Sequence, residues 1–525
     1  MFSEENVSIV YLKNKKNGVT YVYECESFWN KEKKRPDSKR TCIGKLDPKT
    51  GEIVPSKKEV CSKLVVSSCS KTITTIKTIG SALLFDHICK ETDLDSILKQ
   101  SFPDDWRMIL SLARFLVVEG KALSRAELWS RTHQHPYGEF IDNRRISELL
   151  PTITEEKQLG FFKKWAEKRL EDEYLAYDIT SISSYSELNE MLRHGYNRDG
   201  ESLPQINLAM LFGEKTHLPV YYKSLPGSIN DVSTLSNFLK TAVFLGMGKL
   251  RLVMDKGFYS QKNVNEMFDK RMKFTIAVPF SNKFAKEEVE RVRANITDHK
   301  NFIKIGDQGM FCTSSLIKWE QEKRAYLHVF YNASTAAADY EAFLEKMTQW
   351  ELELKNNNLV ANHQIYYDAF FFVKTTPKKG LQITYNQEAI NAYKQNEAGY
   401  LVLLSNDVKE PIEALKIYRN KDVVEKSFDN LKNSLDMKRL RVHLKENMRG
   451  RLFIQFIALI LTSYIQRIMR EKNLFKLGSM SDLLGELDLL NTVKFEGHNG
   501  RIVTELTKKQ KELFDAFDID LKTYV

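Results

Sequence analysis

The sequence predicts a mixed α/β protein with several domains. Three observations lead to this prediction: the chain has 525 residues, 42% of them are hydrophobic, and its middle part alternates strand-like and helix-like segments. The length exceeds that of one ordinary domain, and the composition is that of a folded chain. With 12 Pro and 23 Gly, the composition argues against a collagen-like or linker-dominated architecture.

The formal net charge of +10 favours a polyanionic partner, and nucleic acid is the commonest one. The charge is modest for this length, so a basic protein without such a partner is the alternative. No C-x-x-C pair occurs among the six Cys, which favours buried free thiols over a metal or disulfide framework. Such cysteine usage suits a reducing compartment.

No targeting or membrane segment is expected. The first residues, MFSEENVSIV, lack a basic stretch followed by an apolar core. The longest apolar run, 453–465, is short for a membrane span and contains Gln455, which predicts a buried helix. We therefore expect a cytoplasmic protein without a membrane partner.

Periodicity and turn residues divide the chain into six segments. They are a β-rich basic region (1–75), a helical region that could bind DNA (76–172), the first part of an α/β core (173–282), a mixed, β-rich insertion (283–400), the second part of the core with a long helix (401–470) and a C-terminal region (471–525).

The N-terminal region begins with a predicted hairpin, VSIVYL and VTYVYE, whose turn contains Asn17-Gly18. A basic loop follows beside Trp29 and includes Lys33, Lys34 and Arg35. Cations around an aromatic ring can hold a phosphate backbone and a base, but a solvated loop is an equally good interpretation.

The helical region has three predicted caps. Asp104 or Asp105 precedes one apolar helix, and Ser124–Glu127 and Thr152–Glu155 match the capping-box pattern. These helices could form a DNA-recognition module. Helices with basic faces are usually just solvated, so the sequence gives this role only a modest preference.

The central segment gives the clearest order of elements. Strands are predicted at 174–179, 206–212, 218–225, 250–255 and 274–280, with helices after the third and fourth strands that Asn230 or Asp231 and Ser260 would cap. The order β-β-β-α-β-α-β is that of a ribonuclease H-like fold. In this order the first and fourth strands are neighbours, so Asp178 and Asp255 should lie side by side.

A helix predicted from Ala414 past Leu435 supplies a third acid. Tyr418, Lys421, Glu425 and Lys432 fall within a stripe about 60° wide, beside an apolar stripe that can pack on the sheet. Paired carboxylates repel, and Mg²⁺ ions relieve that repulsion. The alternative is ordinary: strand-end Asp residues in turns or caps, and a surface Glu–Lys pair. Asp199 and Asp231 are competing acids that look like a turn residue and a helix cap.

These residues resemble a DDE transposase of the insertion-sequence group with the signature Y-x2-R-x3-E-x6-K. The resemblance lies in AYDITSI, LVMDKGFYS and YRNKDVVEKSFDNLK, and it covers nearly the whole chain. One departure is Lys421 at the Arg position, which keeps the charge and loses the bidentate fork.

The resemblance implies a bacterial DNA transposase that binds terminal inverted repeats, cuts the donor ends and joins a 3′-hydroxyl to target DNA, as a homodimer on DNA. Asp178, Asp255 and Glu425 would hold two Mg²⁺ ions, with Mn²⁺ as a substitute, while Tyr418, Lys421 and Lys432 would contact phosphate. Trp319 in the insertion could stack on a displaced base, and a core tryptophan is its alternative. The rival functions are a ribonuclease H-like nuclease without strand transfer and a domesticated DNA-binding protein.

Overall fold

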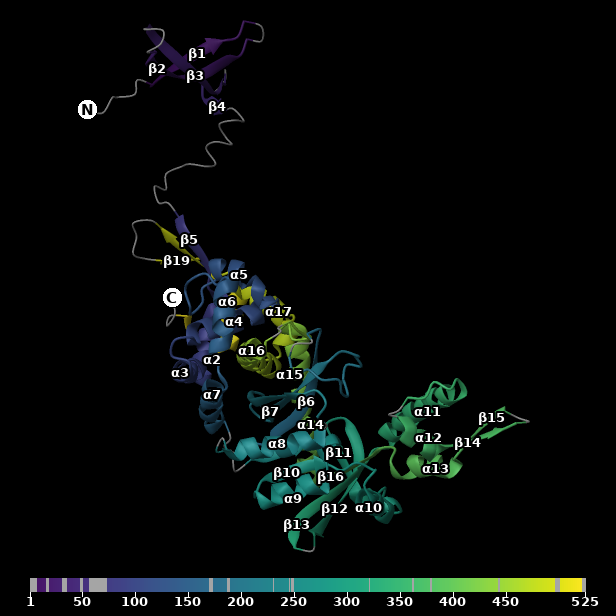
Figure 1. Cartoon of the computed structure of the whole chain (residues 1–525). Helices are drawn as coiled ribbons and strands as arrows, with labels where there is room; N and C mark the ends of the chain where they lie inside the picture. Colours follow the sequence, from purple (N-terminus) through teal and green to yellow (C-terminus); the bar gives the residue numbers. More distant parts are fainter. Residues whose placement is uncertain are drawn as a thin grey trace. The chain divides into compact units, whose positions relative to one another are not determined.

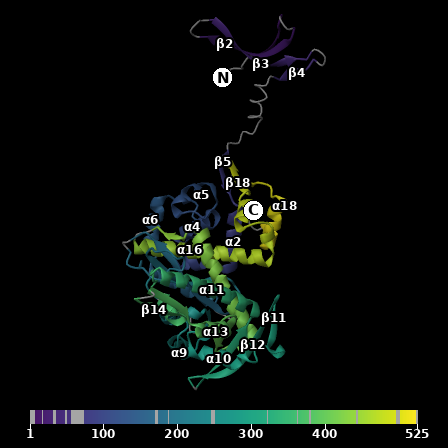
Figure 2. The same ribbon diagram turned by 90° about the vertical axis from the view of Figure 1, so that its right-hand side faces the viewer.

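The computed structural model describes residues 7–15, 18–30, 35–47, 51–55, 73–169, 173–186, 189–229, 231–244, 246, 250–320, 322–360, 363–377, 380–441, 444–495 and 501–521. The chain forms two compact units (Figures 1 and 2). One unit comprises Met1–Ile76 and Val493–Ile502, and the other comprises Lys77–Thr492 and Val503–Val525.

The first unit contains a four-stranded antiparallel sheet. Its strands follow the chain order β1 (Val7–Lys13), β2 (Thr20–Asn30), β3 (Arg35–Leu46) and β4 (Ile53–Pro55). The pairing of β1 with β2 confirms the predicted hairpin, although Asn17 of its turn lies outside the described residues. The basic segment was expected to be a loop. From Arg35 onward it is strand instead, because β3 pairs with β2 along Asn30–Tyr21.

A second sheet, of three strands, has the order β19-β18-β5, with β5 at Ile73–Thr78, β18 at Asn491–Phe495 and β19 at Arg501–Val503. Strands β18 and β19 are neighbours in this sheet, and the residues between them lie outside the described part of the chain.

The second unit is built on a mixed sheet in the order β11-β12-β13-β16-β10-β9-β6-β7-β8. The predicted order of elements is confirmed by β6 (Leu175–Ser184), β7 (Gln205–Gly213), β8 (Pro219–Pro226), α8 (Asp231–Phe244), β9 (Arg251–Met254), α9 (Gln261–Asp269) and β10 (Lys273–Ala277). Nearly every residue of β6 is buried. This burial is expected where helices cover a sheet: the Phe238 ring of α8 stacks on Tyr177 of β6, with 4.8 Å between centroids.

The segment predicted as an insertion is divided between two structures. Its α10 (Lys283–Arg293), β11 (Phe302–Ile305), β12 (Gln308–Trp319) and β13 (Lys323–Tyr331) are followed much later by β16 (Tyr400–Ser405). Strand β16 pairs antiparallel with both β10 and β13. The four strands therefore extend the central sheet, and only the residues between β13 and β16 stand outside it.

Those intervening residues have a small apolar core of their own, which includes Phe343, Trp350 and Tyr367. The elements around this core are α11 (Ala333–Lys355), α12 (Gln364–Phe370), β14 (Phe371–Thr376), β15 (Gly380–Tyr385) and α13 (Gln387–Asn396) (Figure 1). Helix α11 begins at Ala333, where the side chain of Asn332 caps it by accepting the backbone N–H groups of Ser334 and Thr335.

The helical region packs around one long helix, α16 (Lys445–Glu471). Its members are α2 (Gly80–Thr92), α3 (Leu94–Ser101), α4 (Trp106–Glu119), α5 (Ala126–Thr132), α6 (Asn143–Thr152) and α7 (Glu155–Glu167), with α17 (Met480–Leu487) and α18 (Lys508–Ala516) near the C-terminus. Helix α16 contacts α4 and α6 (Figure 2), and its Phe453 ring lies 4.9 Å from Phe102 and 5.2 Å from Phe161. The region from 76 to 172 therefore shares its core with α16.

Helix α16 is, among the described helices, the one with the length and apolar composition of a membrane span. In its most apolar window 78% of the residues are buried inside the protein. Gln455 within it donates to the Leu435 carbonyl at 2.9 Å, so the polar group in the apolar run has a partner. The buried helix predicted for 453–465 is thus part of the protein core.

The predicted caps had mixed outcomes. The Ser260 side chain accepts the backbone N–H of Asn263, as predicted, and Thr507 forms a full capping box at the start of α18. Helix α7 is capped by Thr154 rather than Thr152, because α6 continues to Thr152. Ser124–Glu127 is not a capping box, since a 3-10 turn precedes α5 there. The Asp105 carboxylate accepts a hydrogen bond from the Thr152 hydroxyl and does not cap its own helix. Asn230 lies outside the described residues.

The long helix predicted from Ala414 past Leu435 is broken. Its parts are α14 (Pro411–Asn420), α15 (Asp422–Asp429) and a π-helical turn (Asn430–Ser434), followed by β17 (Arg439–Leu440). At the joint the backbone N–H of Lys421 bonds to Tyr418 and that of Val424 to Lys421, three residues back rather than four. The predicted stripe of side chains from Tyr418 to Lys432 therefore does not lie on one continuous helix, because the helix is interrupted at Lys421.

Candidate active site

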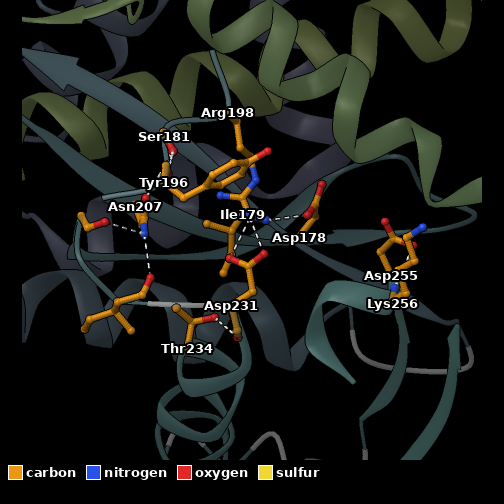
Figure 3. Close-up of polar contacts among 12 residues, drawn as sticks. Asp178, Ile179, Ser181, Tyr196, Arg198, Asn207, Asp231, Thr234, Asp255 and Lys256 are labelled. Carbon is orange, nitrogen blue, oxygen red and sulfur yellow. Dashed lines mark hydrogen bonds and ion pairs between the residues drawn. The ribbon is translucent and has the colours of Figure 1, made fainter. Parts of the chain in front are cut away.

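Two aspartates meet where strands β6 and β9 run parallel. The register pairs Ala176 with Val253 and Tyr177 with Met254, so the next residues, Asp178 and Asp255, lie side by side (Figure 3). Each carboxylate also accepts a backbone N–H at 2.8 Å, from Ile179 and from Lys256. Sheet pairing thus sets the two acids side by side, as predicted. Asp255 directly follows β9, whereas Asp178 lies within β6, which continues to Ser184.

The two carboxylates have different protonation preferences. Burial raises the pKa of Asp178 to about 6, against the opposing effects of the Ile179 N–H and the Arg198 and Lys421 charges. Burial also acts on Asp255, but the Tyr418 hydroxyl and the Lys421 charge outweigh it and lower the pKa of that carboxyl. Two neighbouring acids in such different environments can have different protonation states at the same pH.

Tyr418 and Lys421 connect the broken helix to Asp255. The Tyr418 hydroxyl donates to Asp255 Oδ1 at 2.7 Å, and burial together with Asp255 raises the pKa of Tyr418. Lys421 Nζ lies 5.2 Å from the centre of the Tyr418 ring and 3.3 Å from Glu425 Oε1. Its side chain is 16% exposed, so this ammonium group sits largely buried among acids.

The third acid, Glu425, occupies a different environment. Its side chain is 61% exposed and its ion pair is with Lys421, one turn earlier in the chain. Asp178, Asp255 and Glu425 nevertheless line one open cavity of about 340 Å³. Within the described part of the chain, no three His, Cys, Asp or Glu side chains are close enough to share one ion. The three acids therefore share a cavity without forming a closed ligand set.

Two ion pairs line the same cavity. Arg198 binds both carboxylate oxygens of Asp231, at 2.7 and 2.8 Å (Figure 3), and Lys432 binds both oxygens of Asp199, at 2.7 and 2.8 Å. Asp231 was predicted to be a helix cap; it lies in the first turn of α8, and its carboxylate is held by Arg198. Asp199 is a turn residue before Gly200, whose φ is +71°, but its carboxylate also faces Lys432.

Arg198 is a site residue that sequence analysis missed. It belongs to the same NRDG turn as Asp199, and its partner Asp231 lies 33 residues further on, at the start of a helix. The signal available was a basic and an acidic residue adjacent in one turn. Nothing in the local pattern shows that the two point to different partners in one cavity.

Two of the remaining predicted DNA-contacting residues, Trp319 and Arg35, lie within the described part of the chain. Trp319 ends β12, is 8% exposed and donates its indole N–H to Asn265 Oδ1 at 2.7 Å, which favours the core alternative over base stacking. Arg35 is the exposed first residue of β3 in the first unit. Lys33 and Lys34 lie outside the described residues.

Comparison with known proteins gives one family match. Residues 170–461, more than half of the chain, match the family model "Transposase DDE domain". Among solved structures, the chain resembles the piggyBac transposase of a synaptic complex with hairpin DNA, at 11% sequence identity and a TM-score of 0.36, covering 78% of this chain and 76% of that one. A search of the curated proteins finds no match. The chain belongs to the family of transposases with a DDE domain, which implies phosphoryl-transfer chemistry.

Proposed function

We propose that the protein is the transposase of an insertion sequence, acting on DNA in the bacterial cytoplasm. It would bind the terminal inverted repeats, cleave the donor ends and join the freed 3′-hydroxyl to target DNA. The observation that carries this proposal is the parallel register of β6 and β9, which sets Asp178 beside Asp255 in a cavity that Glu425 also lines.

The donor chemistry of this cavity fits divalent cations. Asp178, Asp255 and Glu425 offer carboxylate oxygens only, the ligands that Mg²⁺ and Mn²⁺ prefer. These three residues would hold two ions, which would stabilise charge on the attacking and leaving oxygens of a phosphodiester. To bind the ions together with the two aspartates, Glu425 must break its ion pair with Lys421. Because the Glu425 side chain is mostly exposed, this change has a small desolvation energy.

The other side chains position these acids and the DNA. The Tyr418 hydroxyl fixes the orientation of Asp255, so it serves as a positioning residue and not as a nucleophile. Lys421, released from Glu425, is placed to neutralise a phosphate at the cavity, as is Lys432 once a phosphate competes with Asp199. Phosphoryl transfer in such a site depends chiefly on positioning and electrostatics.

The test is end cleavage in Mg²⁺ on DNA taken from both flanks of the gene, labelled at one end. Glu425→Gln should abolish cleavage and joining while repeat binding in a gel-shift assay is kept. Asp429→Asn is the matched control, because Asp429 is exposed, lines the same cavity and sits one turn further along α15. Normal cleavage by Glu425→Gln would disprove the site. Cleaved ends without joined product would identify the nuclease alternative.

A further inference from the structure

A second cavity, of about 500 Å³, lies between α7, β8, α8 and α16. It shares no lining residue with the acid cavity. Four cations line it, Lys223 from β8, Lys240 from α8, and Lys445 and Arg449 from α16, together with one carboxylate, Glu155. Its volume is within the usual range of small-molecule sites.

Within the part of the chain that the structure describes, hydrogen bonds hold two cations of this cavity, and Glu155 is the one carboxylate among the lining residues. Lys223 donates to the Thr241 hydroxyl at 2.7 Å and Arg449 to the Ile153 carbonyl at 3.0 Å, both uncharged acceptors. Among the described residues, none of the four cations forms an ion pair with a carboxylate. In the acid cavity, by contrast, Arg198 and Lys432 are both paired. Burial lowers the pKa of Lys223, with Glu155 opposing, so this ammonium group lacks full solvation.

The lining of the cavity also includes apolar side chains. Among them are Leu159 and Phe162 of α7 and Met191; Leu159 and Met191 are half-buried, and Phe162 is buried. A phosphate or sulfate ion would contact the cations alone. A ligand that also contacts the apolar residues carries a phosphate group and an apolar body.

We propose that this cavity binds one nucleotide, with its phosphate among Lys223, Lys240, Lys445 and Arg449 and its base against the apolar side chains of Leu159 and Phe162. Charge-assisted contacts from several cations and an apolar surface for the base are the means by which proteins hold single nucleotides. The nucleotide could come from a bound single strand or from free solution, and the chemistry of recognition is the same. The site is independent of the phosphoryl-transfer site proposed above.

The test uses the full chain and two probes at one fixed salt concentration. Calorimetry with dAMP measures a free nucleotide, and fluorescence anisotropy with a labelled single strand of about 12 nucleotides measures a strand. Binding of dAMP would assign the site to free nucleotides; binding of the strand alone would assign it to DNA. Neither measurement requires cleavage, so an inactive transposase would not confuse the result.

Two variants test the cavity itself. Leu159→Trp places a larger side chain in the lining of the cavity without changing its charge. For the probe that binds, the affinity should fall at least tenfold. Lys240→Gln with Lys445→Gln should weaken it at least fivefold, whereas the control Lys346→Gln with Lys508→Gln, which removes the same charge from exposed positions, should change it less than twofold. Thermal unfolding checks that each variant is folded.

The proposal is overturned if neither probe binds the wild-type chain, or if the Lys240/Lys445 variant loses no more affinity than its control. It is also overturned if folded Leu159→Trp binds as well as the wild type, because a charged patch without a pocket would behave that way.

Discussion

The three acids of the proposed site are held in two different ways. Asp178 and Asp255 sit on paired strands, each anchored by a backbone N–H, and their relative position follows from sheet register. Glu425 sits on a short helix beyond a break, is mostly exposed and pairs with Lys421. The difference teaches that the sheet fixes two of the three acids, whereas the position of the third depends on a short helix and an exposed ion pair.

The largest expected effect is common to all three acids. Asp178→Ala, Asp255→Ala and Glu425→Ala should each reduce end cleavage at least ~10³-fold, because removing one ligand leaves the reacting oxygens without stabilisation. The measurement is single-turnover cleavage of a labelled end in Mg²⁺. Asp178→Ala should keep or raise the melting temperature, since its carboxylate is buried beside another acid. A cleavage-competent Asp255→Ala would mean that the sheet pair is not the site.

Replacing Asp by Glu on the strand, and Glu by Asp on the helix, tests how firmly each element holds its acid. Asp178→Glu adds a methylene to a side chain locked in a sheet, and cleavage should fall about 100-fold or more. Glu425→Asp shortens a side chain that is mostly exposed and not held in the sheet, so we expect a smaller loss, about tenfold. Parallel rates in Mg²⁺ and Mn²⁺ provide the readout. If Glu425→Asp is the more damaging change, the helix is as fixed as the sheet.

Tyr418→Phe tests the link between the two halves of the site. It removes the hydroxyl that donates to Asp255 and leaves the ring in place. The maximal cleavage rate should fall roughly 10- to 100-fold with little change in repeat binding, since a positioning bond to a charged group contributes roughly 1.5–3 kcal/mol. Unchanged rates would show that register alone orients Asp255. Tyr400→Phe is the control, as Tyr400 lies on β16 away from the cavity.

The smallest effect should come from the missed ion pair. Arg198→Gln removes the partner of Asp231, and the half-buried pair should contribute about 1 kcal/mol of folding stability. Cleavage should fall only a few-fold. Chemical denaturation measures the first effect, and the cleavage assay measures the second. A loss of cleavage rate as large as that of Asp255→Ala would show that Arg198 takes part in catalysis.

Sequence patterns predicted the part of the site that depends on local order. The succession of strands and helices was enough to place Asp178 beside Asp255, because parallel neighbours in this fold follow from topology. The break at Lys421 was not predictable, because the apolar spacing from Ala414 to Leu435 stays helical across it. The ion pairs of Arg198 and Lys432 were also missed, since each joins segments that only tertiary packing brings together.

The extent of the sheet was hidden for a related reason. Strand β16 lies far along the chain from β10 and β13, yet it pairs with both. The strand pattern of 283–400 was recognisable, but long-range pairing leaves no trace in periodicity. That β11, β12 and β13 of this segment join the same sheet as the core strands was therefore not predicted.

The central position of α16 limits how this protein can be taken apart or recombined. Its Phe453 packs on rings of the N-terminal helices, while Arg451 binds Asp436 at 2.9 Å just after the π-helical turn. A fragment starting near residue 173 would bare this apolar helix to water and should precipitate. Exchanging the helical region for that of another transposase would need matching changes along α16, because the two parts share one core.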